Sequence, residues 1–155
     1  MARVRENTER LGLSPELITL DATDAGALLA GRQFDAILAD VPCSATGVIR
    51  RNPDVKLLRH AGDPDQFAQQ QQAILSGLWP LLKEGGRLLY VTCSILQQEN
   101  DDRIAHALQA LPGAQLQPLP SQWGVPTQFG IQRLPAMTGG DGLYFSMLRK
   151  VKSGD

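Results

Sequence analysis

Two apolar runs with a helical pattern between them constrain the fold of this chain more than any other feature. The run FDAILAD, residues 34–40, and the run RLLYVTCS, residues 87–94, both have the nearly continuous apolar character of buried strands, and we expect the first to be buried on both faces. Between them, residues 63–82 keep apolar positions at helical spacing. A strand, a helix and a second strand predict neighbouring parallel strands in an α/β sheet.

The N-terminal part predicts two further elements. Residues 2–11 predict an amphipathic helix with Val4 and Leu11 facing inward and with Gly12 as its stop. A short strand is expected over ELITL, residues 16–20. Strands and helices thus alternate along the chain, which is typical of a doubly wound α/β sheet in one domain.

The helix between the two apolar runs has start and stop signals of its own. Asp63, Pro64 and Gln66 form the pattern of an N-cap, a first-turn proline and a third-position glutamine. Pro80 is expected to kink or shorten this helix, because a proline inside a helix removes a backbone hydrogen bond. Gly85-Gly86 is interpreted as a helix C-cap and turn without a cofactor role.

The later segments complete the predicted sheet. Residues 97–111, QQENDDRIAHALQAL, predict a second amphipathic helix, and strands are expected over residues 114–119 and 142–150. Residues 120–141 are rich in Pro and Gly, and we expect them to form a long loop that covers a site.

Composition limits the classes of protein that this chain can belong to. Its 155 residues, 43% hydrophobic and 20% charged, predict one soluble domain. No apolar stretch approaches the roughly 20 residues of a membrane helix, and the N-terminus lacks the apolar core of a secretory signal, so we expect a cytoplasmic protein without a membrane partner. Two cysteines outside any CxxC pair indicate free thiols and no metal site. A net charge of -1 requires any nucleic-acid contact to come from a local basic patch.

Both cysteines follow a predicted buried strand. Asp40 and Cys43 come directly after the first strand, and Cys93 lies at the end of the second. Ligands bind beyond the carboxyl ends of the strands in open α/β sheets, so both thiols are expected to face one crevice. A single free cysteine is usually a small buried hydrophobe, whereas this joint placement favours a thiolate nucleophile with Asp40 as its partner. His60 and His106 are poorly placed for a Cys-His hydrolase, since one belongs to a basic segment and the other to a helix.

A basic stretch follows Cys43. Its members are Arg50, Arg51, Lys56 and Arg59. These side chains can hold the phosphates of a nucleic acid, and the alternative is an ordinary solvated loop and helix face.

The segments DVPCSATGVIRRNPDVK, residues 40–56, and YVTCSILQQEN, residues 90–100, together resemble the RNA (cytosine-C5) methyltransferases of the Nol1/Nop2/Sun type. Within that family the likeness is greatest to the bacterial enzymes that methylate small-subunit ribosomal RNA. GDGLYFSML, residues 140–148, is similar to the last motif of the family. The resemblance covers nearly the whole chain and implies S-adenosyl-L-methionine as cofactor, ribosomal RNA as partner and 5-methylcytosine as product.

The resemblance also implies a role for each candidate residue. Cys93 would be the nucleophile that adds to C6 of a cytosine, Cys43 would assist release of the enzyme, and Asp40 would contact the reacting base or the cofactor. Asp21, which from its position alone either binds an adenosine edge or caps a turn, would lie near the cofactor adenine, and Pro42 would line the cofactor site. The basic residues Arg50, Arg51 and Lys56 would hold the RNA backbone.

By the same resemblance, the glycine-rich cofactor loop of the family should precede residue 1. We therefore expect a partial Rossmann-like class I methyltransferase sheet that lacks its first two strands, with residues 34–40 at an exposed edge. Residues 1–155 would be the C-terminal part of an S-adenosylmethionine-dependent methyltransferase domain, with weak activity by themselves. The alternative is a non-catalytic or partner-dependent fragment. An adenine-N6 methyltransferase is disfavoured, because Cys43 stands where that class has a base-stacking aromatic residue.

Overall fold

The structure, a computed structural model, describes residues 2–135 and 139–152. Its strands are β1 (Phe34–Asp40), β2 (Leu82–Thr92), β3 (Ala114–Gln117), β4 (Val125–Pro126), β5 (Ile131–Arg133) and β6 (Leu143–Lys150). Its α-helices are α1 (Ala2–Arg10), α2 (Ala25–Leu28), α3 (Val55–Leu58), α4 (Asp63–Leu78) and α5 (Asp101–Ala110). Short 3₁₀ turns are η1 (Ala22–Asp24), η2 (Thr46–Val48), η3 (Trp79–Leu81), η4 (Gln97–Glu99) and η5 (Ser121–Trp123). No helix in these two ranges is long and apolar enough to cross a membrane.

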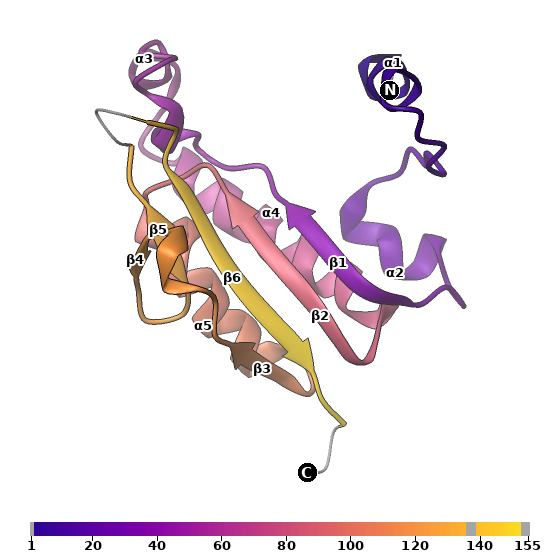
Figure 1. Ribbon diagram of the computed structural model, residues 1–155. Helices are drawn as coiled ribbons and strands as arrows, with labels where there is room; N and C mark the ends of the chain where they lie inside the picture. The colour runs from indigo at the N-terminus through magenta and orange to yellow at the C-terminus, as the bar shows by residue number, and fades with distance from the viewer. Residues whose placement is uncertain (1, 136–138, 153–155) are drawn as a thin grey trace.

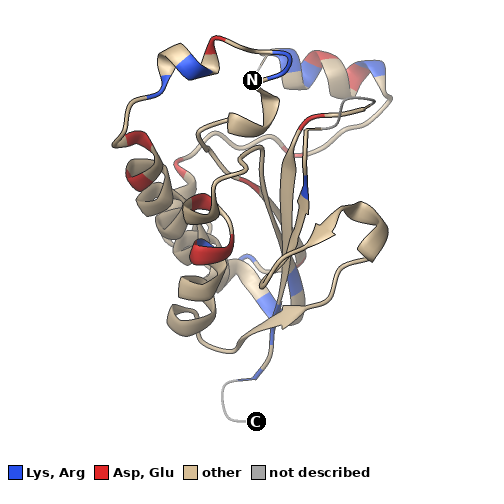
Figure 2. Cartoon of the chain, turned by 90° about the vertical axis from the view of Figure 1, so that its left-hand side faces the viewer, with Lys and Arg blue, Asp and Glu red and all other residues tan. Residues whose placement is uncertain are grey.

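The six strands form one mixed sheet with the order β1-β2-β6-β5-β4, and β3 also pairs with β6. Helices α4 and α5 lie behind the sheet in Figure 1, and Figure 2 shows them stacked on one side of it. The predicted parallel pair is confirmed, since Asp40 of β1 stands opposite Val91 of β2 in a parallel ladder. Strand β6 runs antiparallel to both β2 and β3, so the sheet is not parallel throughout.

The core lies between the sheet and the two long helices. Its fully buried members include Leu75, Leu82, Leu88, Tyr90, Ile104, Tyr144 and Leu148, and Trp79 is nearly so. Helix α4 is capped by Gly62 rather than by Asp63, whose carboxylate instead accepts a hydrogen bond from the backbone N–H of His60. The helix gives way to η3 around Pro80, as the sequence predicts.

Strand β2 begins earlier than the sequence predicts. Gly85 and Gly86 lie inside it rather than at a helix C-cap, because the helix has already ended before Pro80. Gly85 has φ +78, and the register between β1 and β2 shifts between Phe34 and Ala36, so a bulge forms here.

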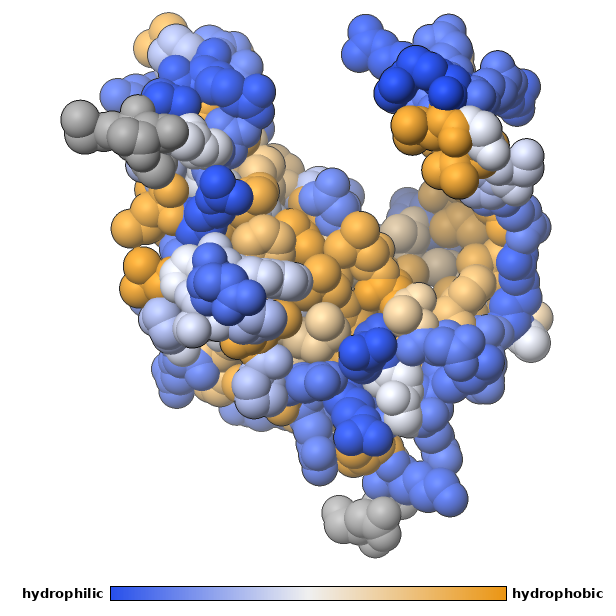
Figure 3. Space-filling view, viewed as in Figure 1, coloured by the Kyte–Doolittle hydropathy of each residue, from blue (hydrophilic) through white to orange (hydrophobic). Residues whose placement is uncertain are grey.

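Strand β1 has the predicted bounds, but the prediction that it is buried on both faces is wrong. Ala39 is buried, whereas Leu38 on the opposite face is 67% exposed. The strand lies at the sheet edge, as expected from the resemblance, and helices of the described chain cover only one face of the sheet. Hydrophobic residues consequently gather over the strands on the uncovered face (Figure 3).

The N-terminal part departs furthest from the sequence predictions. Helix α1 is confirmed and is followed by Gly12 at φ +67, but Val4 and Leu11 are 46% and 58% exposed rather than inward-facing. Residues 16–20 form no strand, because no strand of the described chain lies beside them to complete a ladder. Figure 1 shows α1 standing apart from the sheet.

Two segments predicted as uniform are divided. Within residues 120–141, the expected long loop contains η5, β4 and β5, and Ile131 of β5 pairs with Phe145 of β6. Residues 136–138 of that loop lie outside the described residues. The helix predicted over residues 97–111 begins only at Asp101, because Asn100 leaves the helical region with φ -114 and ψ -101.

Candidate active site

The two cysteines meet beyond the ends of β1 and β2. Because the strands are parallel neighbours, the loop that carries Cys43 and the loop that carries Cys93 leave the sheet at the same edge. The two Sγ atoms are 3.2 Å apart, within hydrogen-bonding distance for sulfur. The thiols therefore face one another, as their positions in the sequence predict, and both are free rather than joined in a disulfide.

The surroundings of the two thiols push their ionisation in opposite directions. The hydrogen bond from Cys43 lowers the pKa of Cys93 to about 7, against the opposing effects of burial and of the negative charges of Asp40 and Glu99. The same hydrogen bond, together with burial, raises the pKa of Cys43. Cys93 is therefore the thiol that ionises more readily to a nucleophilic thiolate, and Cys43 is the one that keeps its proton.

A buried polar cluster joins the two cysteine loops. The carboxylate of Glu99 accepts hydrogen bonds from the backbone N–H of Ser44 at 2.9 Å and from its hydroxyl at 2.8 Å. The hydroxyls of Ser44, Ser94 and Thr46 lie within 3.3 Å of one another. Each serine directly follows a cysteine, so these contacts fix the two loops to one another immediately beside the thiols.

A backbone contact brings a third segment to the same place. The N–H of Gly47 donates to the carbonyl of Cys93 at 2.8 Å, and the N–H of Gly142 donates to the carbonyl of Gly47 at 2.8 Å. A Cβ atom on Gly47 would stand 2.3 Å from the oxygen of Gly142, so only glycine allows this approach. The segment before β6, where the GDG motif lies, thus closes one side of the crevice.

Asn100 anchors the far side of the Cys93 loop. Its amide oxygen accepts from the hydroxyl of Thr92 at 2.7 Å, and its amide nitrogen donates to the carbonyl of Ser94 at 3.0 Å. The same nitrogen donates to the side chain of Gln132 at 2.9 Å. Both residues that flank Cys93 are therefore held by one buried side chain.

The residues expected at the cofactor are exposed and come from two segments, the start of η1 and the end of β1. Asp40 ends β1 and is exposed, and its carboxylate accepts no hydrogen bond within the described ranges. Pro42 is exposed, and its carbonyl accepts from Gln71 at 2.9 Å. Asp21 caps η1, since its Oδ1 accepts from the N–H and the hydroxyl of Thr23, and these bonds lower its pKa.

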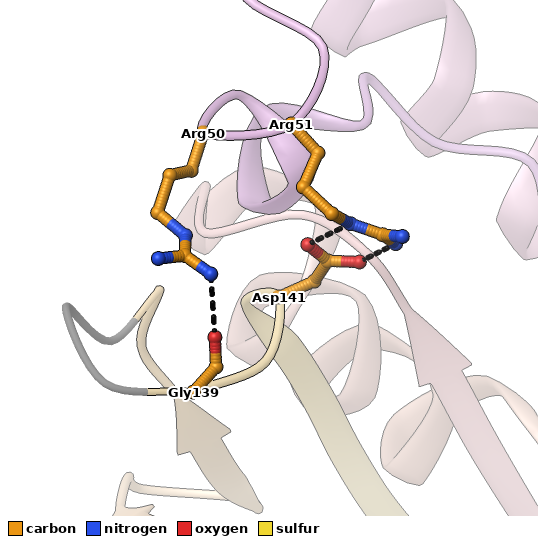
Figure 4. Close-up of polar contacts among 4 residues, drawn as sticks. All are labelled: Arg50, Arg51, Gly139 and Asp141. Atoms are coloured by element: carbon orange, nitrogen blue, oxygen red, sulfur yellow. Dashed lines mark hydrogen bonds and ion pairs between the residues drawn. The ribbon is translucent and has the colours of Figure 1, made fainter.

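The basic residues after Cys43 differ in their contacts. Arg50 donates to the carbonyl of Gly139 at 2.8 Å, and Arg51 forms an ion pair through two nitrogens with Asp141 (Figure 4). Lys56 is exposed on α3. Arg59 is also exposed, and its guanidinium donates to the carbonyl of Ser44 at 2.7 Å.

Neither histidine contributes to the site. His60 is exposed beside Asp63, and His106 is exposed on α5, with no contact to either cysteine in the described chain. A search of the same residues finds no group of three or more His, Cys, Asp or Glu side chains able to hold a metal ion.

Sequence reasoning missed the residues that join the loops, chiefly Glu99, Asn100 and Gly47. A signal was present, because an acidic residue and an amide precede an amphipathic helix a few positions after Cys93. Their partners, however, belong to other loops, so the sequence alone assigns them no role.

The profile of the family described as 16S rRNA methyltransferase RsmB/F matches residues 1–149. Ribosomal RNA small subunit methyltransferase B of Pseudomonas putida is 46% identical over 151 residues, 97% of this chain and 35% of that protein. A probable ribosomal RNA small subunit methyltransferase B of Coxiella burnetii is 44% identical over 151 residues, 96% of this chain and 35% of that protein. The chain thus spans about a third of the length of these relatives.

Solved structures agree with this similarity. The crystal structure of NSun6 from Pyrococcus horikoshii with SFG superposes with a TM-score of 0.85 at 28% identity, covering 97% of this chain and 38% of that one. A methyltransferase homolog protein from Pyrococcus horikoshii superposes with a TM-score of 0.80 at 27% identity, covering 97% of this chain and 50% of that one. The mixed α/β sheet therefore matches part of the sheet of known methyltransferases.

Proposed function

The chain belongs to the 16S rRNA methyltransferase RsmB/F family, and from this premise we propose that it supplies the catalytic cysteines for transfer of a methyl group to C5 of a cytosine in small-subunit ribosomal RNA. The observation that carries the proposal is the pair of Sγ atoms 3.2 Å apart, of which Cys93 has a pKa of about 7. Residues 1–155 are the C-terminal part of the methyltransferase domain in this proposal. The chain's coverage of about a third of its relatives supports its being one part of a longer protein of this kind.

Cys93 provides the nucleophile. C5 of cytosine is weakly nucleophilic, and addition of the Cys93 thiolate to C6 breaks the C5–C6 double bond and places its electron pair on C5. After C5 has taken the methyl group, its proton passes to a base, for which this proposal takes the exposed carboxylate of Asp40, and the electron pair of the C5–H bond returns to the ring. The double bond re-forms and Cys93 leaves as a thiolate. Cys43, which is protonated and hydrogen-bonded to that sulfur, assists this release by stabilising the departing thiolate.

Asp40, Pro42 and Asp21 line one wall of the cofactor site in this proposal. S-adenosyl-L-methionine supplies the methyl group from its sulfonium when it is bound. The chemistry of the residues fits this group, because the exposed Asp40 carboxylate and the second oxygen of Asp21 can accept hydrogen bonds from its amino groups. Asp40 also lies at the end of β1, next to the crevice, where a ligand of this fold is expected.

Arg50, Arg51 and Lys56 are proposed to contact the RNA backbone. The side chain of Arg51 is 67% exposed although it is paired with Asp141, so a phosphate can reach its guanidinium from solvent. Its ion pair with Asp141 holds the guanidinium at the rim of the crevice, near the segment that contacts Gly47. A phosphate contact there would position the RNA backbone beside the two thiols.

The test uses a hybrid enzyme in which residues 1–149 replace the matching segment of the Pseudomonas putida relative. With small-subunit RNA and methyl-labelled S-adenosyl-L-methionine, we expect the hybrid to label the RNA and the Cys93→Ala variant to label none. The Cys43→Ala variant is expected to retain RNA as a covalent adduct on a denaturing gel, because release of Cys93 is impaired. Labelling by Cys93→Ala, or no adduct with Cys43→Ala, contradicts the assigned roles.

A second candidate function is that of a partner-dependent fragment, and the uncovered edge of the sheet favours it. Leu38 is exposed on β1, and α1 buries none of its residues. An exposed edge strand with an apolar face is a place where another polypeptide binds. The test adds the part of the Pseudomonas putida relative that this chain does not cover. If the chain binds S-adenosyl-L-methionine only in the presence of that part, the second candidate function is supported. Tight binding by the chain alone contradicts it.

A further inference from the structure

Glu99 is a buried carboxylate that the proposed chemistry does not use. Its side chain is fully buried, and it forms no ion pair with a lysine or arginine among the described residues. Burying a carboxylate without a cation is costly unless hydrogen bonds compensate, and the donors that meet Glu99 both belong to Ser44. A polar group of this kind is retained where it fixes an arrangement that apolar packing would leave loose.

We propose that Glu99 is a positioning residue that holds the Cys43 loop against the Cys93 loop and so keeps the two thiols in contact. Each of its carboxylate oxygens takes one donor of Ser44, the residue next to Cys43. A two-point contact restricts both the distance and the rotation of the loop. The consequence for methyl transfer rests on the function proposed above, whereas the effect on the thiol pair does not.

Glu99 and Ser44, the two residues joined by this contact, are each also hydrogen-bonded to another part of the fold. On one side, the backbone oxygen of Glu99 accepts a hydrogen bond at 2.7 Å from the hydroxyl of Tyr90, a fully buried residue of β2. On the other side, the carbonyl of Ser44 accepts from Arg59 at 2.7 Å. Ser44 is therefore held by two residues, Glu99 and Arg59, and the backbone of Glu99 is fixed to β2.

The hydrogen bonds of Glu99 and its negative charge affect Cys93 in opposite ways. The hydrogen bonds keep Cys43 in place, and Cys43 lowers the pKa of Cys93, whereas the negative charge of Glu99 raises that pKa. Glu99→Gln separates the two contributions. A glutamine retains an oxygen that accepts from the Ser44 N–H, and its NH₂ can donate to the Ser44 hydroxyl, while the charge is lost.

The test measures how readily the two thiols of the full chain form a disulfide in a glutathione redox buffer. Oxidation joins the Sγ atoms of Cys43 and Cys93 and releases two protons and two electrons, which reduce one glutathione disulfide to two glutathione thiols. The equilibrium constant is the effective concentration of one thiol at the other. We expect Glu99→Ala to lower it about tenfold or more, and Glu99→Gln to remain within about threefold of the unmodified chain.

Two further measurements separate positioning from a general structural effect. Glu84→Ala, at an exposed glutamate on β2, is the matched control and should leave the effective concentration unchanged. The pH midpoint for alkylation of Cys93 should fall in Glu99→Gln, because the charge is lost while Cys43 stays in place. Loss of positioning in Glu99→Ala should leave Cys93 without its hydrogen bond and raise that midpoint.

An unchanged effective concentration in Glu99→Ala, or an equal loss in Glu99→Ala and Glu99→Gln, would overturn the proposal. Circular dichroism checks that each variant is folded. If Glu99→Ala does not fold, Ser44→Ala replaces it, with Thr46→Ala as its control, since both changes remove a hydroxyl of the cluster but only the first removes a contact with Glu99. An unchanged value in Ser44→Ala, or an equal loss in the two variants, also overturns the proposal. These measurements require no RNA and no cofactor, so a failure of methyl transfer in the hybrid enzyme leaves their outcome intact.

Discussion

The cysteine crevice, residues 40–47 and 92–100, and the N-terminal segment, residues 2–21, are opposite extremes of the same chain. In the crevice, polar side chains such as Ser44 and Ser94 are buried and hydrogen-bonded across the two loops. In the N-terminal segment, α1 forms but buries nothing, and the expected strand does not form. A helix satisfies its own backbone, whereas a strand and a buried face both need a partner, and this requirement separates the two regions.

The largest effect should come from a core leucine compared with an edge leucine. Leu88→Ala removes a fully buried side chain from the helix-covered face of β2 and should lower the free energy of unfolding by about 2–5 kcal/mol. Leu38→Ala, on the open face of β1, should change it by less than about 0.5 kcal/mol. Urea denaturation of both variants checks the contrast. Similar losses would mean that the open face of β1 is packed in solution.

A smaller loss of stability is expected from crowding the crevice itself. Gly47→Ala places a Cβ against the backbone of Gly142 and Cys93, which cannot retreat without breaking two hydrogen bonds, and should cost about 1–3 kcal/mol. Gly139→Ala is the control, since a Cβ there meets nothing within 4 Å and φ lies outside the left-handed region. Thermal unfolding of the pair measures the difference, and equal midpoints would contradict the close approach at Gly47.

The contrast between the thiols can be sharpened by pH. Alkylation of Cys93 follows its thiolate form, so the rate should rise through a midpoint near pH 7. Cys43→Ala removes the hydrogen bond that lowers this pKa, and the midpoint should move up toward the ordinary value of 9.0. Cys43→Ser retains a donor and should fall between. If the pH midpoint is the same in the unmodified chain and in both Cys43 variants, the contact between the two sulfur atoms does not persist in solution.

The rim of the crevice should give the smallest effect. The ion pair of Arg51 with Asp141 is exposed on the arginine side, so its contribution to stability should be smaller than the effect of Gly47→Ala and should shrink as salt is added. A double-mutant cycle of Arg51→Ala and Asp141→Asn, run at low and high salt, isolates it. A coupling energy that is larger and does not change with salt would mean that this ion pair is shielded from solvent and held rigidly, as the contacts in the crevice are.

The sequence predicts a structural element correctly where the segments that pack against it can be recognised from the sequence pattern of the element itself. The bounds of β1, the end of α4 at Pro80 and the meeting of Cys43 with Cys93 follow from periodicity, proline chemistry and parallel pairing. The exposure of Leu38 does not, because an apolar strand has the same local pattern at an edge as in the middle of a sheet.

The residues of the candidate site also differ in whether the sequence predicts them. Cysteines at two strand ends can be found from the sequence, since the fold itself brings parallel strand ends together. The role of Glu99 as the acceptor for Ser44, and the diversion of Arg59 from the basic group to the Ser44 carbonyl, depend on loop conformations that no periodic pattern encodes. Sequence reasoning therefore located the two thiols and missed the side chains that hold their loops together.

The peptide group of Gly47 has a consequence for the order in which the chain folds. The Gly47 carbonyl accepts from the N–H of Gly142, and the Gly47 N–H donates to the carbonyl of Cys93, so three segments far apart in the sequence must meet before both bonds exist. Contacts between segments far apart in the sequence form late in folding, because closing the loop between them costs chain entropy before the contact energy is gained. We therefore expect the helix-backed strands to form first and the fast-reacting thiol of Cys93 to emerge in the final phase. During refolding, the rise in the alkylation rate of Cys93 would therefore report when the sheet is complete.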